Sequence, residues 1–252
     1  MISDNNTLKP GWRVPDNVRA LSTTRRGGVS AAPWESLNLG HHVNDVAEHV
    51  AENRQRLAQH AGLAVENIGW LNQVHGTSVV ELSPGNASAL PEADASYTRQ
   101  PGIACAILSA DCLPIVLADN AGTVVGAAHA GWRSLCGGVI EQLIGAMNVP
   151  GAELNAWLGP AIGPDQFEVG PEVREAFLGQ DEGAHLAFQT RGARAGHYLA
   201  DIYCLARRRL ARIGVEAVSG GSLCTVNDRD WFFSYRRDGQ TGRMATLVWL
   251  KS

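Results

Sequence analysis

The stretch IACAILSADCLPIVLADNAGTVVGAAHAG, residues 103–131, contains three short hydrophobic runs that are separated by turn residues. The runs cover residues 103–109, 113–118 and 124–130. Short runs with almost unbroken hydrophobicity are typical of strands that are buried on both faces. The stretch therefore predicts three interior strands of a protein that contains both helices and strands.

Patterns for further helices and strands lie on both sides of this stretch. We expect helices over about 46–61, 135–147, 171–178 and 197–213. We expect strands over about 18–23, 68–74, 77–82, 232–235 and 244–250, with a turn at His75-Gly76 and a loop over 83–101. Because no repeat or linker divides the chain, we predict a single mixed α/β domain over residues 1–252, with 1–16 as a loosely held lead-in.

The composition excludes several classes of protein. The 252 residues are 45% hydrophobic, which suits a folded chain with a full core rather than a disordered one. The net charge of −4 gives no reason to expect nucleic acid as a partner. No apolar run reaches the ~18 residues of a membrane span, and the first residues do not resemble a secretory signal. Five cysteines without a CxxC pair fit reduced thiols, so we expect a cytoplasmic protein with no membrane partner.

Three candidate metal ligands lie where hydrophobic runs end. They are His75 in NQVHG, Cys112 in SADCLP and His129 in AAHAGWR, separated by 37 and 17 residues. These separations are too long for a zinc finger and suit a site that separate strands assemble. Two imidazoles and one thiolate are a common ligand set for catalytic Zn²⁺, which keeps a fourth position open.

Simpler interpretations of these residues stay open. A free cysteine often only fills space in a core, and a histidine at a strand end is often a hydrogen-bonding residue. Cys112 and His129 could also form a nucleophile and its base without any metal.

Arginines and two aspartates are further candidates. Arg25 lies in a glycine-rich loop, Arg133 follows His129, and Arg236 lies in SYRRDG. Arginine side chains suit phosphate or carboxylate, although each could equally be a solvated charge or an ion-pair partner. Asp111 and Asp94 are candidates for supporting a ligand or for acid–base catalysis, and turn or capping roles fit them equally well.

At these residues the sequence resembles the YfiH family, also called laccase-domain or purine nucleoside phosphorylase-like proteins. The resemblance covers nearly the whole chain after the first ~15 residues. It rests on TTRRGGVS, SLNLG, NQVHG, ADASY, SADCLPI, AAHAGWR, LGPAIGP, FEVG and FFSYRRDGQTGRMA, which occur in this order.

The resemblance implies a fold, a metal site and an activity. The implied fold is a layered one, with mixed sheets between helices, related to bacterial cysteine-dependent deamidase toxins. The implied Zn²⁺ ligands are His75, Cys112 and His129, which would also be catalytic together with Asp111. The implied activity is phosphorolysis of adenosine, inosine, guanosine and methylthioadenosine, with adenosine deamination as a second reaction. Candidates for binding substrate or phosphate are Arg25, Asn38, Arg133 and Arg236.

Two parts of that implication can be checked against residue types. Zinc deaminases carry a glutamate in an HxE motif, and the chain has none near the three ligands, so the proton carrier is unassigned and Asp111 is only a candidate. A multicopper laccase needs many histidines in HxH pairs, whereas this chain has eight histidines and no such pair. Weak polyphenol oxidation with one Cu²⁺ in place of Zn²⁺ stays conceivable.

Two other functions remain as alternatives. One is a cysteine-dependent hydrolase that edits peptidoglycan precursors, in which Cys112 attacks and His129 acts as the base. The other is a metal-storage or partner-binding module without turnover. We expect a monomer or a homodimer.

Overall fold

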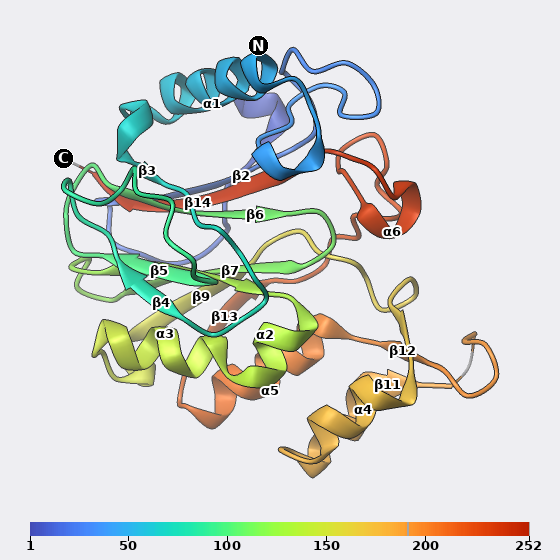
Figure 1. The fold of residues 1–252 in the computed structure, drawn as a ribbon. Helices are drawn as coiled ribbons and strands as arrows, with labels where there is room; N and C mark the ends of the chain where they lie inside the picture. Colours follow the sequence, from blue (N-terminus) through green and yellow to red (C-terminus); the bar gives the residue numbers. More distant parts are fainter. Residues whose placement is uncertain (191, 252) are drawn as a thin grey trace.

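The fold is known from a computed structural model, in which residues 1–190 and 192–251 are described. Two β-sheets lie face to face, with helices on both outer sides (Figure 1). This is the predicted α/β arrangement of mixed sheets between helices. No helix of the described residues combines the length and the apolar character that a membrane span requires.

The first sheet joins the two ends of the chain. Its strands, in spatial order, are β1 (Thr7–Leu8), β2 (Val18–Thr23), β14 (Met244–Leu250), β6 (Ala104–Ser109) and β3 (Ile68–Gly69). Only the pair of β3 and β6 is parallel. Since β14 lies between β2 and β6, the last residues of the chain sit next to its first strands.

The second sheet has six strands. In spatial order they are β13 (Ala217–Gly220), β9 (Leu154–Leu158), β7 (Leu113–Asp119), β8 (Val125–Ala130), β5 (Ala95–Thr98) and β4 (Val79–Glu81). The two outermost pairs are parallel and the inner ones antiparallel. The three strands predicted from residues 103–131 are thus divided between the sheets, with β6 in the first and β7 and β8 in the second.

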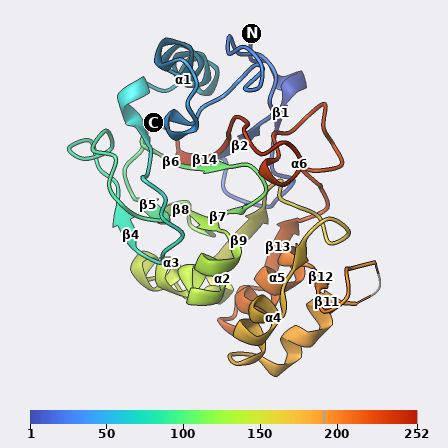
Figure 2. The same cartoon turned by 45° about the vertical axis from the view of Figure 1, so that its right-hand side comes forward.

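Helices cover the outer faces of both sheets. The helix α1 (Ala47–Ala61) lies over the first sheet, while α2 (Trp132–Gly137), α3 (Val139–Met147) and α5 (Ile202–Arg212) lie over the second (Figure 1). Figure 2 shows α4 (Pro171–Leu178) beside a small third sheet of β10 (Glu168–Val169), β12 (Tyr198–Ala200) and β11 (Phe188–Gln189). The short helix α6 (Tyr235–Asp238) precedes β14. Single 3₁₀ turns cover Asp4–Asn6, His41–Val43, Val65–Asn67, Gly151–Glu153 and Glu182–Ala187.

The strand β6 shows why its sequence is hydrophobic throughout. Cys105 and Ile107 face the second sheet and pack in the cluster between the two sheets. Ala104 and Ala106 face the other way and pack with Leu57 of α1. Both faces of β6 are buried, as the unbroken hydrophobic run predicts.

Several local predictions are wrong, because sheet membership and helix breaks depend on more than local pattern. The segments around His75 do not form paired strands, since β3 lies in the first sheet and β4 in the second. Residues 83–101 are not all loop, since β5 inserts its small residues between β4 and β8. The helix expected over 135–147 is interrupted at Gly138, whose φ is +98°.

The remaining corrections concern chain ends and caps. Asp201 caps α5 by accepting a hydrogen bond from the Cys204 amide, so the helix begins at residue 202 and a strand precedes it. Ser234 caps α6 in the same way, where a strand was expected over 232–235. Within the predicted lead-in, β1 pairs with β2 and Ile2 is buried in the core.

Candidate functional site

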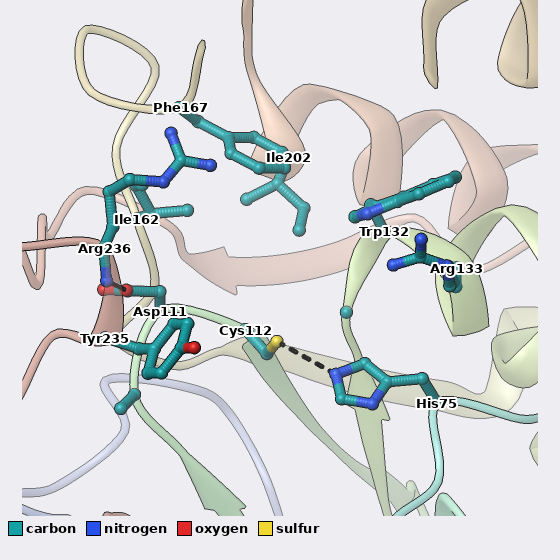
Figure 3. Close-up of a pocket in the computed structure, with 12 residues that line it drawn as sticks. His75, Asp111, Cys112, Trp132, Arg133, Ile162, Phe167, Ile202, Tyr235 and Arg236 are labelled. Carbon is teal, nitrogen blue, oxygen red and sulfur yellow. Dashed lines mark hydrogen bonds between the residues drawn. The ribbon is translucent and has the colours of Figure 1, made fainter. Parts of the chain in front are cut away.

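The structure brings the three predicted ligands together at one end of the two sheets. His75 follows β3, Cys112 lies in the turn between β6 and β7, and His129 lies in β8. Their ligand atoms all lie within 4.8 Å of one another. The Cys112 Sγ atom is 3.8 Å from His75 Nε2 (Figure 3). The ring centroids of His75 and His129 are 4.8 Å apart.

The buried carboxylate of Asp94 holds two of these residues. Its Oδ2 atom accepts hydrogen bonds from the Val74 and Gly76 amides, and its Oδ1 atom accepts one from the His75 amide. These bonds fix a backbone turn in which His75 has a φ of +62°, a left-handed conformation that is unusual for histidine. Asp94 therefore positions the His75 ring through the backbone.

Asp94 also orients the second imidazole. The Oδ1 atom of Asp94 is 2.8 Å from Nδ1 of His129, and both side chains are buried. Although burial acts to raise it, the pKa of Asp94 is lowered by this hydrogen bond and by those from the backbone. A carboxylate that holds one imidazole nitrogen leaves the other free to bind a metal, which is a common arrangement at metal sites.

Cys112 and His129 shift each other's pKa. Burial opposes ionisation of Cys112, but the charge of His129 and hydrogen bonds from His129 and His75 lower the pKa of this thiol to about 6. Burial likewise opposes protonation of His129, but Cys112 and Asp94 raise the pKa of this imidazole to about 9. Near neutral pH the metal-free site therefore holds a thiolate beside an imidazolium.

The site leaves room for an ion between the donor atoms. Gly131 lies directly after β8, and a Cβ atom there would be 3.0 Å from Cδ2 of His75 and 3.1 Å from Sγ of Cys112. A residue with a side chain would occupy the space that the donor atoms surround. Two imidazoles, one thiolate and an open side are what a catalytic zinc site requires, so the residues fit the implied metal.

Two cavities meet at the ligands. The first, which we call the apolar cavity, has a volume of about 290 Å³ (Figure 3). Its walls are His75, Ala110, Asp111, Cys112, Gly131, Trp132, Arg133, Ile162, Phe167, Ile202, Tyr235 and Arg236. The second, the basic cavity, has a volume of about 410 Å³. Its walls are His42, Gln73, His75, Leu108, Ser109, Ala110, Cys112, His129, Tyr235 and Arg243.

The predicted arginines fall into two groups. Arg133 and Arg236 line the apolar cavity, where Arg133 stacks on Trp132 and Arg236 lies over Phe167. Arg25 lines a separate cavity, and its guanidinium donates to the backbone carbonyls of Glu35 and Arg229. The structure thus places Arg25 apart from the residues that line the two cavities at the ligands.

Asp111 and Asn38 are both held by hydrogen bonds. Asp111 has a φ of +97°, and its carboxylate accepts hydrogen bonds from Thr225 Oγ1 and from the Arg236 amide at 2.6 and 2.7 Å. It lines the apolar cavity beside Cys112. Asn38 is fully buried and lines neither cavity.

Sequence reasoning gave no role to many residues of the cavity walls, among them Trp132, Phe167, Tyr235 and Arg243. These four residues lie in segments already quoted for the family resemblance. The local sequence pattern in those segments does not distinguish a residue that lines a cavity from one that packs in the core. Tyr235 lines both cavities, and Arg243 precedes β14 by one position.

Comparison with known proteins gives a consistent result over almost the whole chain. The family model described as multi-copper polyphenol oxidoreductase laccase matches residues 19–251. A protein of Pseudomonas aeruginosa named purine nucleoside phosphorylase is 52% identical over 98% of this chain and 99% of its own length. Purine nucleoside phosphorylase YfiH of Escherichia coli is 52% identical over 96% of this chain and 98% of its own length.

A solved structure has the same fold. The crystal structure of a Neisseria meningitidis protein, described by its family model as a domain of unknown function, matches with a TM-score of 0.93 and 50% identity, covering 98% of this chain and all of that one. The family resemblance seen in the sequence motifs is therefore confirmed by the full-length relatives and by the fold. The chain belongs to the YfiH family of laccase-like proteins.

Proposed function

We propose that the protein is a zinc-dependent purine nucleoside phosphorylase with a second, adenosine deaminase activity. The observation that carries the proposal is the His75, Cys112 and His129 cluster at the junction of two cavities. The names of the close relatives support the phosphorylase part. The substrates are adenosine, inosine, guanosine and methylthioadenosine, each with phosphate.

The metal would be held by the three ligands named above. When bound, Zn²⁺ supplies a Lewis acid and lowers the pKa of a coordinated water toward ~7. Cu²⁺ competes well for nitrogen and sulfur ligands, so weak polyphenol oxidation by a copper-loaded form is an additional proposal. Asp94 keeps the ring of His129 turned toward the cluster through the 2.8 Å contact at Nδ1.

The apolar cavity suits a purine base. Trp132 and Phe167 offer aromatic surface, and Ile162 and Ile202 exclude water from the same space. Arg133 and Arg236 place positive charge in the wall of this cavity, where they would stabilise the negative charge that develops on the departing base. Arg25 and Asn38 remain predicted contributors to substrate binding, although neither lines the two cavities at the ligands.

Asp111 is the proposed proton carrier for deamination. It lies in the wall of the apolar cavity, next to Cys112 in sequence. Thr225 and the Arg236 amide hold the two carboxylate oxygens of Asp111 in place. The oxygen that would carry the proton therefore has a defined position. Replacement of Asp111 by asparagine tests this role by loss of deamination at unchanged metal content.

A specific observation favours the second candidate, a cysteine-dependent hydrolase that edits peptidoglycan precursors. The lowered pKa of Cys112 and the raised pKa of His129 describe an activated thiolate beside an imidazolium, with Asp94 behind the imidazole. This is the arrangement of a cysteine nucleophile, its base and an orienting acid. Such an enzyme would keep its activity after removal of metal and lose it after alkylation of Cys112.

One experiment separates these functions. Protein freed of metal and then reconstituted with one equivalent of Zn²⁺ is incubated with inosine and phosphate, and with adenosine alone. We expect hypoxanthine and ribose 1-phosphate from the first mixture and inosine from the second, with neither product from the metal-free protein or from Cys112→Ala. Equal turnover by wild type and Cys112→Ala, or no turnover by the zinc form, would overturn the proposal.

A further inference from the structure

Four cavities of the described residues have an arginine in their walls, and they differ in charge. The cavity at Arg19 also contains Asp4 and Asp16. The apolar cavity includes Asp111, and the cavity around Arg25 includes Glu35 and Asp230. The basic cavity contains Arg243 and His42, and no aspartate or glutamate is among its described walls. Among these cavities, the basic cavity is therefore the one with no carboxylate to compete for an anionic ligand.

The guanidinium of Arg243 keeps donors for a ligand. Its Nη1 atom donates to the carbonyls of Thr241 and Gly242 at 3.0 Å each. Within residues 1–190 and 192–251, no hydrogen bond from Nε or Nη2 and no ion pair with a carboxylate is found. Burial lowers the pKa of Arg243, and the nearby Cys112 and Asp111 groups oppose that shift. The side chain is thus a positive charge close to the ligands with two nitrogens left to donate.

A segment far away in the sequence builds the support for this side chain. The Oδ1 atom of Asn38 accepts a hydrogen bond from the Arg243 amide, and the Leu39 amide donates to the Arg243 carbonyl. A Cβ atom on Gly40 would lie 2.8 Å from Cγ of Arg243. The SLNLG motif therefore holds Arg243 in place, which gives buried Asn38 a role without contact to substrate.

His42 faces the same cavity and adds a neutral hydrogen-bonding group. Partial burial and the charge of Arg243 lower the pKa of His42 below its usual value, so its ring is neutral near pH 7. A neutral imidazole can donate one hydrogen bond without adding charge. One guanidinium and one imidazole beside the metal ligands match the oxygens of a tetrahedral oxyanion.

We infer that the basic cavity binds inorganic phosphate through Arg243, while the nucleoside base occupies the apolar cavity on the other side of the metal ligands. This inference rests on the proposed phosphorylase function. In that reaction a phosphate oxygen bonds to the anomeric carbon as the glycosidic C–N bond breaks. The electron pair leaves with the base, and the proton of hydrogen phosphate ends on the base.

The test compares Arg243→Gln with Arg207→Gln as a matched control. Arg207 also donates to two backbone carbonyls, those of Val218 and Gly220, and lines neither cavity. Inorganic phosphate is titrated into zinc-reconstituted protein by calorimetry, and KM is measured for phosphate and for inosine. Loss of charge-assisted hydrogen bonds predicts a Kd and KM for phosphate about 10- to 100-fold higher in Arg243→Gln, with partial rescue by Arg243→Lys.

The outcomes distinguish this inference from the proposed function. Unchanged phosphate affinity in Arg243→Gln with a folded protein, or loss of affinity in Arg25→Gln instead, would overturn the inference even if the enzyme turns over. If wild type binds phosphate through Arg243 but never cleaves inosine, the proposed function fails and the anion site stands. An equal rise of KM for inosine and phosphate would show a general defect and contradict the division into two cavities.

Discussion

The two sides of the site are held in place by different means. On the side of the metal ligands, the single carboxylate of Asp94 bonds to three backbone amides and to His129. On the opposite side, which we call the arginine side, Asn38 Oδ1 and the Leu39 amide hold Arg243 through its backbone. The Asp45 carboxylate acts there only indirectly, by accepting a hydrogen bond from Nδ2 of Asn38. The difference teaches that one carboxylate holds the ligand side directly, whereas an amide side chain and backbone hydrogen bonds hold the arginine side. Variants that affect one side should therefore spare the other.

The largest effect is expected from Asp94→Asn. The amide keeps the size of the side chain but removes the charge that orients His129 and accepts the bonds of residues 74–76. Loss of such a supporting carboxylate typically lowers metal affinity about 10- to 100-fold. Competition with a chromophoric chelator measures this affinity. In the zinc-saturated variant, the affinity for phosphate should stay within about twofold of that of the wild type.

The matched control is Asp119→Asn. Asp119 is also buried and accepts three hydrogen bonds from its own turn, two from Thr123 and one from the Val124 amide. Both variants should lower the midpoint of thermal unfolding, but only Asp94→Asn should weaken metal binding. An equal loss of metal affinity in the two variants would mean that the effect is general destabilisation.

The pH dependence of metal affinity provides a second test of the ligand side. The pKa of His129 is raised to about 9, so below that pH the metal must displace a proton from this imidazole. Affinity should fall about tenfold for each pH unit between 9 and 6. Below about pH 6 the Cys112 thiolate is also protonated, and the fall should steepen to about 100-fold per unit. Affinity that does not change between pH 9 and 7 would contradict the thiolate–imidazolium pair.

The smallest effect on the site is expected from Asn38→Ala. This change leaves the Arg243 amide and other buried groups without a partner, so it should lower the free energy of unfolding by about 1–3 kcal/mol. Because Arg243 itself remains, KM for phosphate should rise only a few-fold, on the order of what a small misplacement costs. Metal affinity should not change. A loss of bound zinc in this variant would contradict the claim that the two sides are held independently.

The ligand side could largely be anticipated from the sequence, and the arginine side could not. His75, Cys112 and His129 stand at the ends of hydrophobic runs, and strand ends in layered sheets tend to meet. Arg25 and Arg243 both lie in loops that contain glycine, so the local sequence does not distinguish them. Their positions relative to the metal ligands depend on the pairing of β14 with β2 and β6. The pairing of β14 with β2 joins residues more than two hundred positions apart, and the pairing with β6 joins residues more than one hundred apart, which no local pattern encodes.

The same limit explains the errors in the fold. The apolar runs around His75 have the periodicity of strands, but hydrogen bonds to Asp94 draw residues 74–76 out of any hairpin. The helix of Pro171–Leu178 was predicted correctly, because a proline in the first turn is a strong local signal. The helix with proline in its first turn was thus easier to predict than sheet membership, whereas the break at Gly138 and the caps at Asp201 and Ser234 were missed.

The most direct test of the account is the metal itself. Protein purified without a metal-affinity resin should contain one zinc per chain by elemental analysis. X-ray absorption should show one sulfur at about 2.3 Å and two imidazole nitrogens at about 2.0–2.1 Å, and the sulfur should be lost in Cys112→Ala. Protein that phosphorolyses inosine at full rate with no bound metal, or zinc without a sulfur neighbour in the wild type, would contradict it.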